Sequence, residues 1–441
     1  MNLLKKIFSI FFLIISILFL LYTAYKSEIY WNSLKRDYYQ IYYIISFLLI
    51  FFSIITFFIS QNAKRYLIIF GFSSIVILYI FEIILILNDQ IKKFPSSEIK
   101  VQYEKETGKK FDTRNRIEIY TDLKKDNSNI KIKVAPTNHL HKKNSILPLS
   151  GISNSRTIYD NDNGYYSIYQ SDRYGFNNPD KEWDSKDIEF LLVGDSFTHG
   201  SSINRPHDIA SILRILSKKS VLNLGYDNNG PLINYATLRE YLNTNVKNII
   251  WIFDSSTNLK DLNIEYKNKI LNNYLIDPNF TQNLKLKQKK IDEIGNKEID
   301  DRLQRHSFQY KLVKFLKIYN IRNFIFLKES KEKIQIKILK NILSLAKELS
   351  NKNNSKIYFV YLPDYKRYKY DYDDKEYQLV KKIVYDLDIP LIDIHDEIFE
   401  KEKNPLKLFS FELNSHYTKE GYKKVSESIY YFIENSKKND T

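Results

Sequence analysis

Three long apolar runs at the start of the chain constrain its fold more than any other feature. They cover residues 7–24, 41–60 and 66–87, and are 18, 20 and 22 residues long. About 20 helical residues cross the hydrocarbon core of a bilayer, and no polar face interrupts these runs. The sequence therefore predicts a transmembrane anchor of three helices within residues 1–90, with membrane lipid as an expected partner.

The charges that flank these spans nearly balance, so the positive-inside rule alone leaves the orientation open. Lys5 and Lys6 before the first span, and the tight turn at residues 62–65, favour a cytoplasmic N-terminus. Three spans then place the rest of the chain outside the cytoplasm, on a multi-pass protein of the inner (cytoplasmic) membrane. Glu82 lies inside the third run, where a charge is costly, and we expect its side chain to extend to the outer interface.

Composition argues against several classes of function. The net charge is +15, but Lys and Arg are spread along the chain and mixed with acids rather than gathered in a stripe. This distribution argues against a nucleic-acid partner. The chain has no cysteine, which excludes disulfides and thiolate metal sites. We expect neither a metal nor another cofactor.

After the anchor, two regions differ in pattern. Residues 91–185 are polar, with short alternating stretches at 117–120 and 130–134, and are expected to form a β-rich lead-in packed on the next domain. In residues 186–435, short apolar runs alternate with amphipathic helical patterns. The expected strands cover 188–193, 220–224, 248–253, 357–362 and 389–392, and the expected helices cover 208–217, 232–242 and 332–349. This alternation predicts an α/β fold with a parallel sheet covered on both faces, in the doubly wound class. Residues 263–330 are interpreted as a helical insertion.

The first candidate for chemistry is a serine at the end of the first expected strand. Gly194, Asp195 and Ser196 follow that strand, and a helix is expected to start soon afterwards. Helix-start N–H groups favour negative charge, such as that of a tetrahedral intermediate. Gly194 permits the tight turn, and Asp195 can hold the loop through backbone hydrogen bonds. The same three residues also suit an ordinary helix cap, so the serine needs a base to be a nucleophile.

The candidate base is His416, in a loop that leads into the last amphipathic helix. In a doubly wound sheet this loop lies at the same carboxyl edge as Ser196, which satisfies the geometric demand of a nucleophile and a base. His199 is nearer in sequence and is expected to be structural. The other histidines are expected at the surface: His139, His141, His207, His306 and His395.

These residues together resemble the SGNH/GDSL hydrolases. The first block is Gly194-Asp195-Ser196, the second contains Gly225, and the last contains His416. More narrowly, the chain resembles a bacterial, membrane-anchored subgroup with N-terminal transmembrane spans, through residues 165–179, 229–232 and 280–284. The resemblance extends over residues 100–435. It implies a flavodoxin-like three-layer domain that acts on ester bonds, usually acyl groups on carbohydrate or lipid.

The resemblance also implies roles for single residues. Ser196 corresponds to the nucleophile and His416 to the general base, with the N–H groups of Ser196 and Gly225 as oxyanion donors. The family's asparagine donor aligns with Thr257, one residue before Asn258, so either side chain is a candidate for this role. The acid that usually precedes the histidine by three residues is replaced by Leu413, and Glu412 is the expected substitute if the loop bends. If it does not, a Ser–His dyad or a backbone carbonyl has to fix the tautomer.

Two functions from different classes follow from this pattern. The first is a serine esterase that removes or transfers acyl groups, typically acetyl, on cell-envelope polysaccharide or another glycan. Its partner is then an acylated glycan or lipid substrate, and a transferase would also need a membrane partner to deliver the acyl donor. The alternative is a non-catalytic glycan-binding or assembly subunit of a polysaccharide export system, built on a degraded SGNH fold.

Overall fold

The computed structural model describes residues 2–31, 33, 36–93, 97–142, 145–242, 245–256, 258–326 and 336–439. The chain forms two compact units. The membrane unit consists of Met1–Lys92 and a second segment, Leu312–Lys328, and the α/β unit consists of Lys93–Lys311 and Glu329–Thr441. The chain thus begins in the membrane unit and returns to it once. The expected insertion at 263–330 is divided between the two units.

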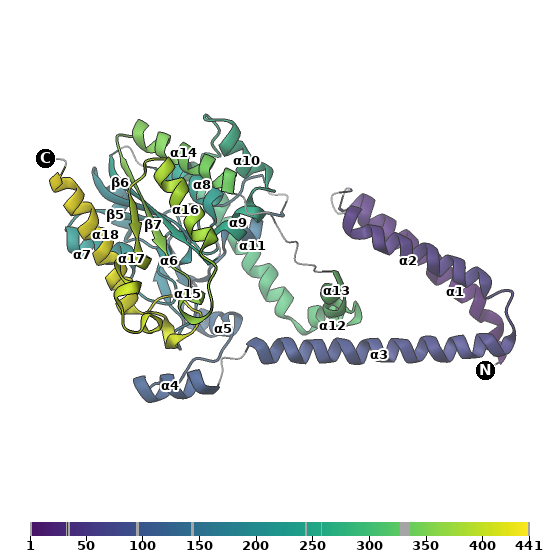
Figure 1. The fold of residues 1–441 in the computed structure, drawn as a ribbon. Helices are drawn as coiled ribbons and strands as arrows, with labels where there is room; N and C mark the ends of the chain where they lie inside the picture. The colour runs from purple at the N-terminus through teal and green to yellow at the C-terminus, as the bar shows by residue number, and fades with distance from the viewer. Residues whose placement is uncertain are drawn as a thin grey trace. The chain divides into compact units, whose positions relative to one another are not determined.

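Three helices of the membrane unit are long and apolar enough to cross a membrane (Figure 1). These spans are Ile7–Tyr30, Tyr38–Ile55 and Gln61–Asn88, within α1 (Asn2–Ala24) and the following π-helical turn (Tyr25–Tyr30), α2 (Arg36–Ile55) and α3 (Gln61–Lys93). The second helix ends at Ile55, earlier than the expected residue 60. Ser60 instead caps the next helix, because its Oγ accepts a hydrogen bond from the Ala63 N–H at 3.2 Å.

The side chain of Glu82 does not extend outward as expected. Its side chain is buried, and it accepts hydrogen bonds from the backbone N–H groups of Asn320 and Ile321, both at 2.9 Å. These residues begin α13 (Tyr319–Phe326), which follows α12 (Phe308–Leu316). Sequence spacing could not predict this partner, because it lies more than 200 residues further along the chain.

The α/β unit contains a parallel sheet of five strands in the order β5-β4-β6-β7-β8. The strands are β4 (Ile188–Val193), β5 (Val221–Asn223), β6 (Val246–Asp254), β7 (Lys356–Leu362) and β8 (Leu391–Asp393). Numbered along the chain, this order is 2-1-3-4-5, which is the flavodoxin-like arrangement. The predicted strands and the doubly wound parallel sheet are confirmed. The strand order reverses between β4 and β6, and ligands bind at the carboxyl edge of such a switch point.

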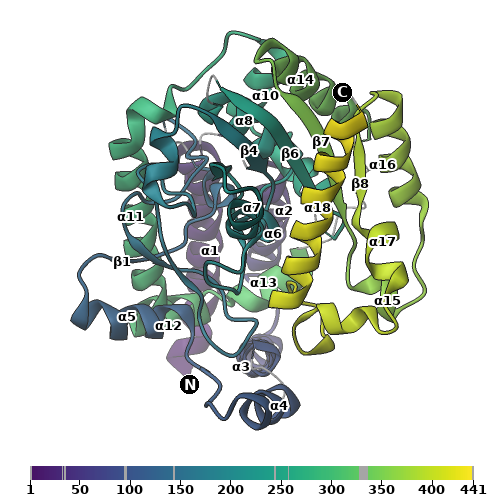
Figure 2. The same cartoon turned by 90° about the vertical axis from the view of Figure 1, so that its left-hand side faces the viewer.

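Helices cover both faces of this sheet, so alternate residues of its strands enter two separate cores (Figure 2). In β6, Ile249, Trp251 and Phe253 face one core, while Ile250 and Ile252 face the other. The first core is closed by α8 (Pro231–Tyr241), α14 (Ile336–Lys352) and α16 (Lys375–Asp386), and the second by α7 (Ile209–Ser217) and α18 (Lys419–Asn439). Strands buried on both faces explain why the sequence shows continuous apolar runs rather than alternation.

The region before the sheet contains more helix than the sequence indicated. It has α4 (Ser97–Thr107), α5 (Arg116–Asp126) and a small sheet of β1 (Ile130–Ile132), β2 (Arg156–Ile158) and β3 (Ile168–Gln170). Residues 117–120, which alternate in polarity, lie in α5 and not in a strand. Asn115 and Glu118 form a capping box at the start of this helix, and this local hydrogen bonding outweighs the alternation.

Further helices belong to the α/β unit. They are α6 (Ser196–His199), α9 (Asn258–Glu265), α10 (Lys269–Ile276), α11 (Gln288–His306), α15 (Lys366–Lys369) and α17 (Ile394–Glu397).

Candidate active site

Ser196 is the first residue of α6, directly beyond the carboxyl end of the fully buried strand β4. Asp195 caps the helix, because its Oδ1 accepts a hydrogen bond from the Phe197 N–H at 3.0 Å. Gly194 is required for space, since a Cβ there would lie 2.0 Å from Thr198 Oγ1 and 2.9 Å from the Ile252 carbonyl oxygen. This close packing of the turn fixes the start of α6 and therefore the position of Ser196.

Ser196, His416 and Asp162 form a continuous hydrogen-bonded chain. The Oγ of Ser196 lies 2.8 Å from Nε2 of His416, and Nδ1 of the same ring lies 2.6 Å from Oδ2 of Asp162. The side chains of His416 and Asp162 are 20% and 30% exposed, so solvent and a small substrate reach them. Ser196 and Asp162 each lie within hydrogen-bonding distance of the His416 ring, which is the arrangement that a nucleophile, a base and an orienting acid require.

Asp162 belongs to a loop, residues 159–164, that follows β2 of the small sheet. Asp160 in this loop forms ion pairs with Lys133 and Arg116. Two hydrogen bonds fasten the loop to Ser202, just beyond α6: the Asp162 N–H donates to Ser202 Oγ at 3.3 Å, and Asn163 Nδ2 donates to the Ser202 carbonyl at 2.8 Å. The lead-in region therefore supplies one of the three polar groups of the site.

Sequence reasoning missed Asp162 because it searched for the acid beside the histidine. Asp162 is 254 residues away from His416 in the sequence. Two features of the sequence indicate that the acid comes from another loop. Leu413 cannot serve as the acid, and residues 160–164 form a run of Asp, Asn and Gly after a short strand, which is typical of a loop.

Glu412, the expected orienting acid, does not contact the ring. Its backbone and that of Phe411 have positive φ angles of 54° and 58°, and its carboxylate accepts a hydrogen bond from Asn404 at 3.4 Å. The loop therefore directs this side chain away from His416. The structure corrects the expectation for Glu412, since the carboxylate on Nδ1 is that of Asp162.

Opposing effects act on the titration of this pair. Burial alone would lower the pKa of His416, but the hydrogen bond and charge of Asp162 outweigh it and raise that pKa above 6.5. Burial would raise the pKa of Asp162, but the hydrogen bond from His416 dominates and lowers it to about 2. Asp162 is therefore ionised throughout the physiological range, and its charge favours the protonated form of His416.

The expected oxyanion donors differ in availability. The Gly225 N–H donates to Asn223 Oδ1 at 2.9 Å, so it is already engaged. Among the hydrogen bonds of the described residues, none uses the Ser196 N–H. Thr257 lies outside the described residues, and Asn258 is described only as the first backbone position of α9.

His199 has the structural role that the sequence indicated. It is buried, its ring stacks on Tyr159 with centroids 4.0 Å apart, and Nδ1 lies 3.3 Å from the Gly225 carbonyl oxygen. Burial lowers its pKa to about 3, so the ring is neutral. It ties the loop after β5 to α6.

The hydrogen-bonded residues Ser196, His416 and Asp162 all line a cavity of about 280 Å³. Its walls come from the loops after β4, β5, β6 and β7 and from the loop that carries His416. The lining residues are Asp162, Asp195, Ser196, Phe197, Asp227, Asn228, Asp254, Ser256, Asp364, Tyr365, Phe409, Asn414, Ser415 and His416. Five are aspartates, and among the described lining residues none is Lys or Arg. The cavity thus combines the aromatic side chains of Phe197, Tyr365 and Phe409 with an acidic wall.

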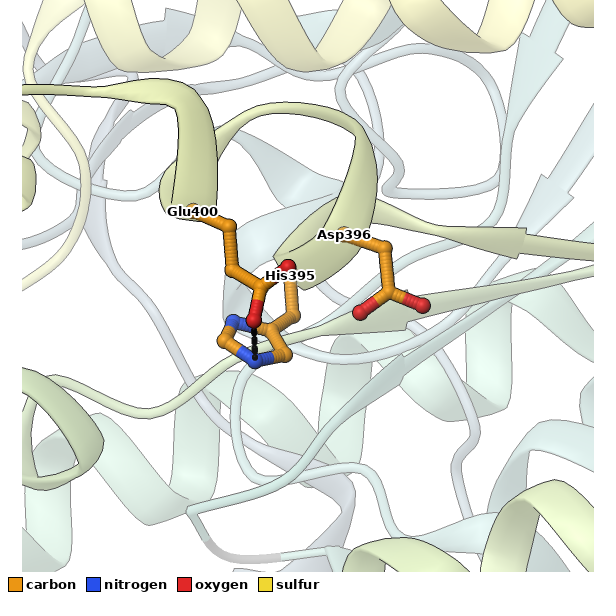
Figure 3. Close-up of side chains that lie close together, drawn as sticks. All are labelled: His395, Asp396 and Glu400. Carbon is orange, nitrogen blue, oxygen red and sulfur yellow. Dashed lines mark ion pairs between the residues drawn. The ribbon is translucent and has the colours of Figure 1, made fainter.

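One other cluster, on and just after α17, has the composition of a cation site (Figure 3). His395 Nε2 lies 3.6 Å from Glu400 Oε1, with Asp396 nearby. The ring nitrogens are engaged, however: Nδ1 by the Tyr368 hydroxyl at 2.8 Å and Nε2 by the Arg367 guanidinium at 3.2 Å. Burial and then the charge of Arg367 lower the pKa of His395. We therefore interpret it as a hydrogen-bonded cluster and not as a cation site. His395, like His139, is buried rather than at the surface.

Solved structures with a similar fold include a lipolytic protein of the G-D-S-L family and two acetylxylan esterases. A member of the lipolytic protein G-D-S-L family from Veillonella parvula is 13% identical, with a TM-score of 0.31 over 55% of this chain and 95% of that one. An acetylxylan esterase from Geobacillus stearothermophilus is 11% identical, with a TM-score of 0.30 over 55% and 92%. An acetyl xylan esterase termed AlAXEase is 11% identical, with a TM-score of 0.33 over 56% and 100%.

No protein-family profile and no curated protein matches the sequence. The structural likenesses are distant and do not show the function of this chain.

Proposed function

We propose that this protein is a membrane-anchored serine esterase of the SGNH/GDSL type. The observation that carries the proposal is the hydrogen-bonded chain from Ser196 through His416 to Asp162 at the carboxyl edge of the sheet. Ser196 is the nucleophile, His416 the general base, and Asp162 the acid that fixes the imidazole orientation. A plain helix cap would need neither a histidine at 2.8 Å nor a carboxylate behind it.

The reaction follows from these positions. Nε2 of His416 accepts the Ser196 hydroxyl proton as Oγ attacks the ester carbonyl, and Asp162 stabilises the resulting imidazolium. Collapse of the tetrahedral intermediate breaks the bond to the alcohol oxygen, which takes the proton from His416. Water then attacks the acyl-enzyme by the same route, and a carboxylic acid leaves with Ser196 restored. Each proton that the base accepts is returned, so no further reactant is required.

The oxyanion is stabilised first by the Ser196 N–H at the start of α6. Because Asn223 already occupies the Gly225 N–H, we assign the second donor to the start of α9, where Asn258 or Thr257 is the candidate. A single oxyanion donor is typically worth about 2.7–4 kcal/mol of transition-state stabilisation. A site with one donor displaced remains active, though slower.

The cavity supports a small acyl group on an uncharged substrate. A volume of about 280 Å³ suits an acetyl group and part of a sugar, and the largely buried side chains of Tyr365 and Phe409 form part of its wall. The five aspartates disfavour anionic substrates such as uronates or phosphates. We therefore propose a neutral acetylated glycan of the cell envelope as the substrate. With the membrane unit as anchor, the α/β unit would act outside the cytoplasm.

The test is hydrolysis of a short acetyl ester and of an acetylated glycan by the full chain in detergent micelles. We expect turnover by the wild type and none above background for Ser196→Ala, whose thermal unfolding should match the wild type. His416→Ala should be almost as severe, because nucleophile and base act as a unit. A well-folded wild type that binds glycan but releases no acid would instead support the non-catalytic binding or assembly role.

A further inference from the structure

The chain returns to the membrane unit after it has formed most of the α/β unit. We call residues 312–326 the return segment; it comprises the second half of α12 and all of α13. The segment contains Lys314, Lys317 and Arg322 and no acidic residue. Sequence patterning alone grouped it with the long helical insertion.

The carboxylate of Glu82 fixes the return segment to α3. The Asn320 side chain donates to it at 2.8 Å, in addition to the backbone N–H groups of Asn320 and Ile321. A carboxylate inside an apolar span is costly without partners, and the first N–H groups of a helix lack acceptors within that helix. The Glu82 carboxylate therefore gains hydrogen-bond donors, and the N–H groups at the start of α13 gain an acceptor. This mutual pairing makes the contact between α3 and the return segment specific.

Further contacts extend this attachment along the membrane unit. Tyr79 donates to the Leu316 carbonyl oxygen at 2.9 Å, three residues before Glu82 on α3. Arg322 donates to the hydroxyls of Tyr38 and Tyr42, on α2, at 2.8 and 3.0 Å. The return segment thus contacts two helices that are apolar and long enough to cross a bilayer.

Apolar side chains of the return segment remain uncovered within the described part of the chain. Leu312, Val313, Leu316, Tyr319 and Phe324 are 43%, 46%, 56%, 37% and 70% exposed. The basic residues Lys314, Lys317 and Arg322 lie among them, and the segment contains no acidic residue. Exposed apolar side chains combined with Lys and Arg are typical of helices that lie in the membrane interface and bind anionic lipid.

The position of Glu82 along α3 agrees with a location of the return segment in the membrane interface. Glu82 lies six residues before the end of the span Gln61–Asn88, which corresponds to about 9 Å along a helix. That span has 28 residues, whereas about 20 cross the hydrocarbon core, so its last turns extend into the headgroup region. The return segment is therefore attached near the boundary between acyl chains and headgroups.

We propose that the return segment is an interfacial element that binds an anionic lipid surface. Its apolar side chains enter the outer part of the acyl layer, and Lys314 and Lys317 contact anionic headgroups. This role concerns attachment to lipid and is independent of the chemistry at Ser196.

Single-cysteine labelling tests this proposal, because the chain has no cysteine of its own. Val313→Cys and Leu316→Cys would carry an environment-sensitive fluorophore on the full chain, reconstituted in phosphatidylcholine–phosphatidylglycerol vesicles. Ile77→Cys, in the third span, is the lipid-exposed control. Ile276→Cys and Leu286→Cys are the controls in the α/β unit, since these side chains are 77% and 88% exposed.

Brominated lipid should quench the labels at 313 and 316 at least twofold more than those at 276 and 286. Iodide in the buffer should quench only the latter pair. Labels at 313 and 316 that iodide reaches as readily as 276 would overturn the proposal. Labels protected from both quenchers would overturn it as well, because a protein partner would then cover the segment.

Lipid charge gives the second readout. Brominated phosphatidylglycerol should quench the label at 316 more than the same fraction of brominated phosphatidylcholine. In a Lys314→Gln/Lys317→Gln background this preference should disappear, while quenching at position 77 stays the same. Equal quenching by both lipids in the wild-type background would overturn the assignment to anionic lipid.

Discussion

At the scale of single residues, the site depends on which carboxylate holds the imidazole. In the proposed mechanism Asp162, at 2.6 Å from Nδ1, keeps the proton on that nitrogen, so that Nε2 can accept the proton of Ser196. An amide at the same place can donate to Nδ1 and stabilise the wrong tautomer. The role that Glu412 was expected to have therefore belongs to a residue of another loop.

This assignment predicts a contrast between two conservative variants. Asp162→Asn should lower kcat on a short acetyl ester by on the order of 10⁴-fold. Glu412→Gln should leave kcat within about twofold of the wild type, because its carboxylate contacts Asn404 and not the ring. Steady-state kinetics of both variants checks this, and a larger loss for Glu412→Gln than for Asp162→Asn would refute it.

The same pair predicts the direction of the pH dependence. His416 acts as a base only when neutral, so kcat/KM should rise with pH through its raised pKa, above 6.5. Asp162→Asn removes the carboxylate that raises this pKa and leaves burial, which lowers it. The acidic limb of the residual activity should then shift to lower pH. A limb that stays in place, or moves upward, is inconsistent with the His416–Asp162 pair.

At the scale of elements, the turn between β4 and α6 is fixed by close packing. A Cβ at Gly194 would overlap Thr198 Oγ1 and press on the backbone of β6. Gly194→Ala should therefore lower the free energy of unfolding by about 1–3 kcal/mol, as overpacked sites do. Gly71→Ala is the matched control, because nothing lies within 4 Å of a Cβ there. Thermal unfolding of the full chain measures both, and equal midpoints for the two variants would contradict the packing argument.

The elements also explain how much could be predicted. The parallel sheet and the Ser196–His416 pair were predictable, because buried strands give continuous apolar runs and their carboxyl ends share one edge. Asp162 was not, because its loop precedes the sheet and reaches the site only through tertiary contacts to Ser202. Helix α5 was also missed, because its capping box outweighs the alternating polarity of residues 117–120.

At the scale of the whole molecule, the chain passes three times between the membrane unit and the α/β unit. It does so because the return segment belongs to the membrane unit although it lies between two parts of the α/β unit in the sequence. With a cytoplasmic N-terminus, an alkaline phosphatase fusion after Asp89 should be active and one within residues 61–65 inactive. Activity after residues 61–65 together with inactivity after Asp89 would reverse the proposed orientation.

The central claim is that Ser196 is an activated nucleophile, and covalent labelling tests it most directly. Full-length protein in micelles is treated with a fluorophosphonate, digested, and mapped by mass spectrometry. We expect one adduct, on the peptide that contains Ser196, absent from Ser196→Ala and greatly reduced in His416→Ala. A folded wild type that forms no adduct at Ser196, or an adduct that persists in Ser196→Ala, would contradict the account.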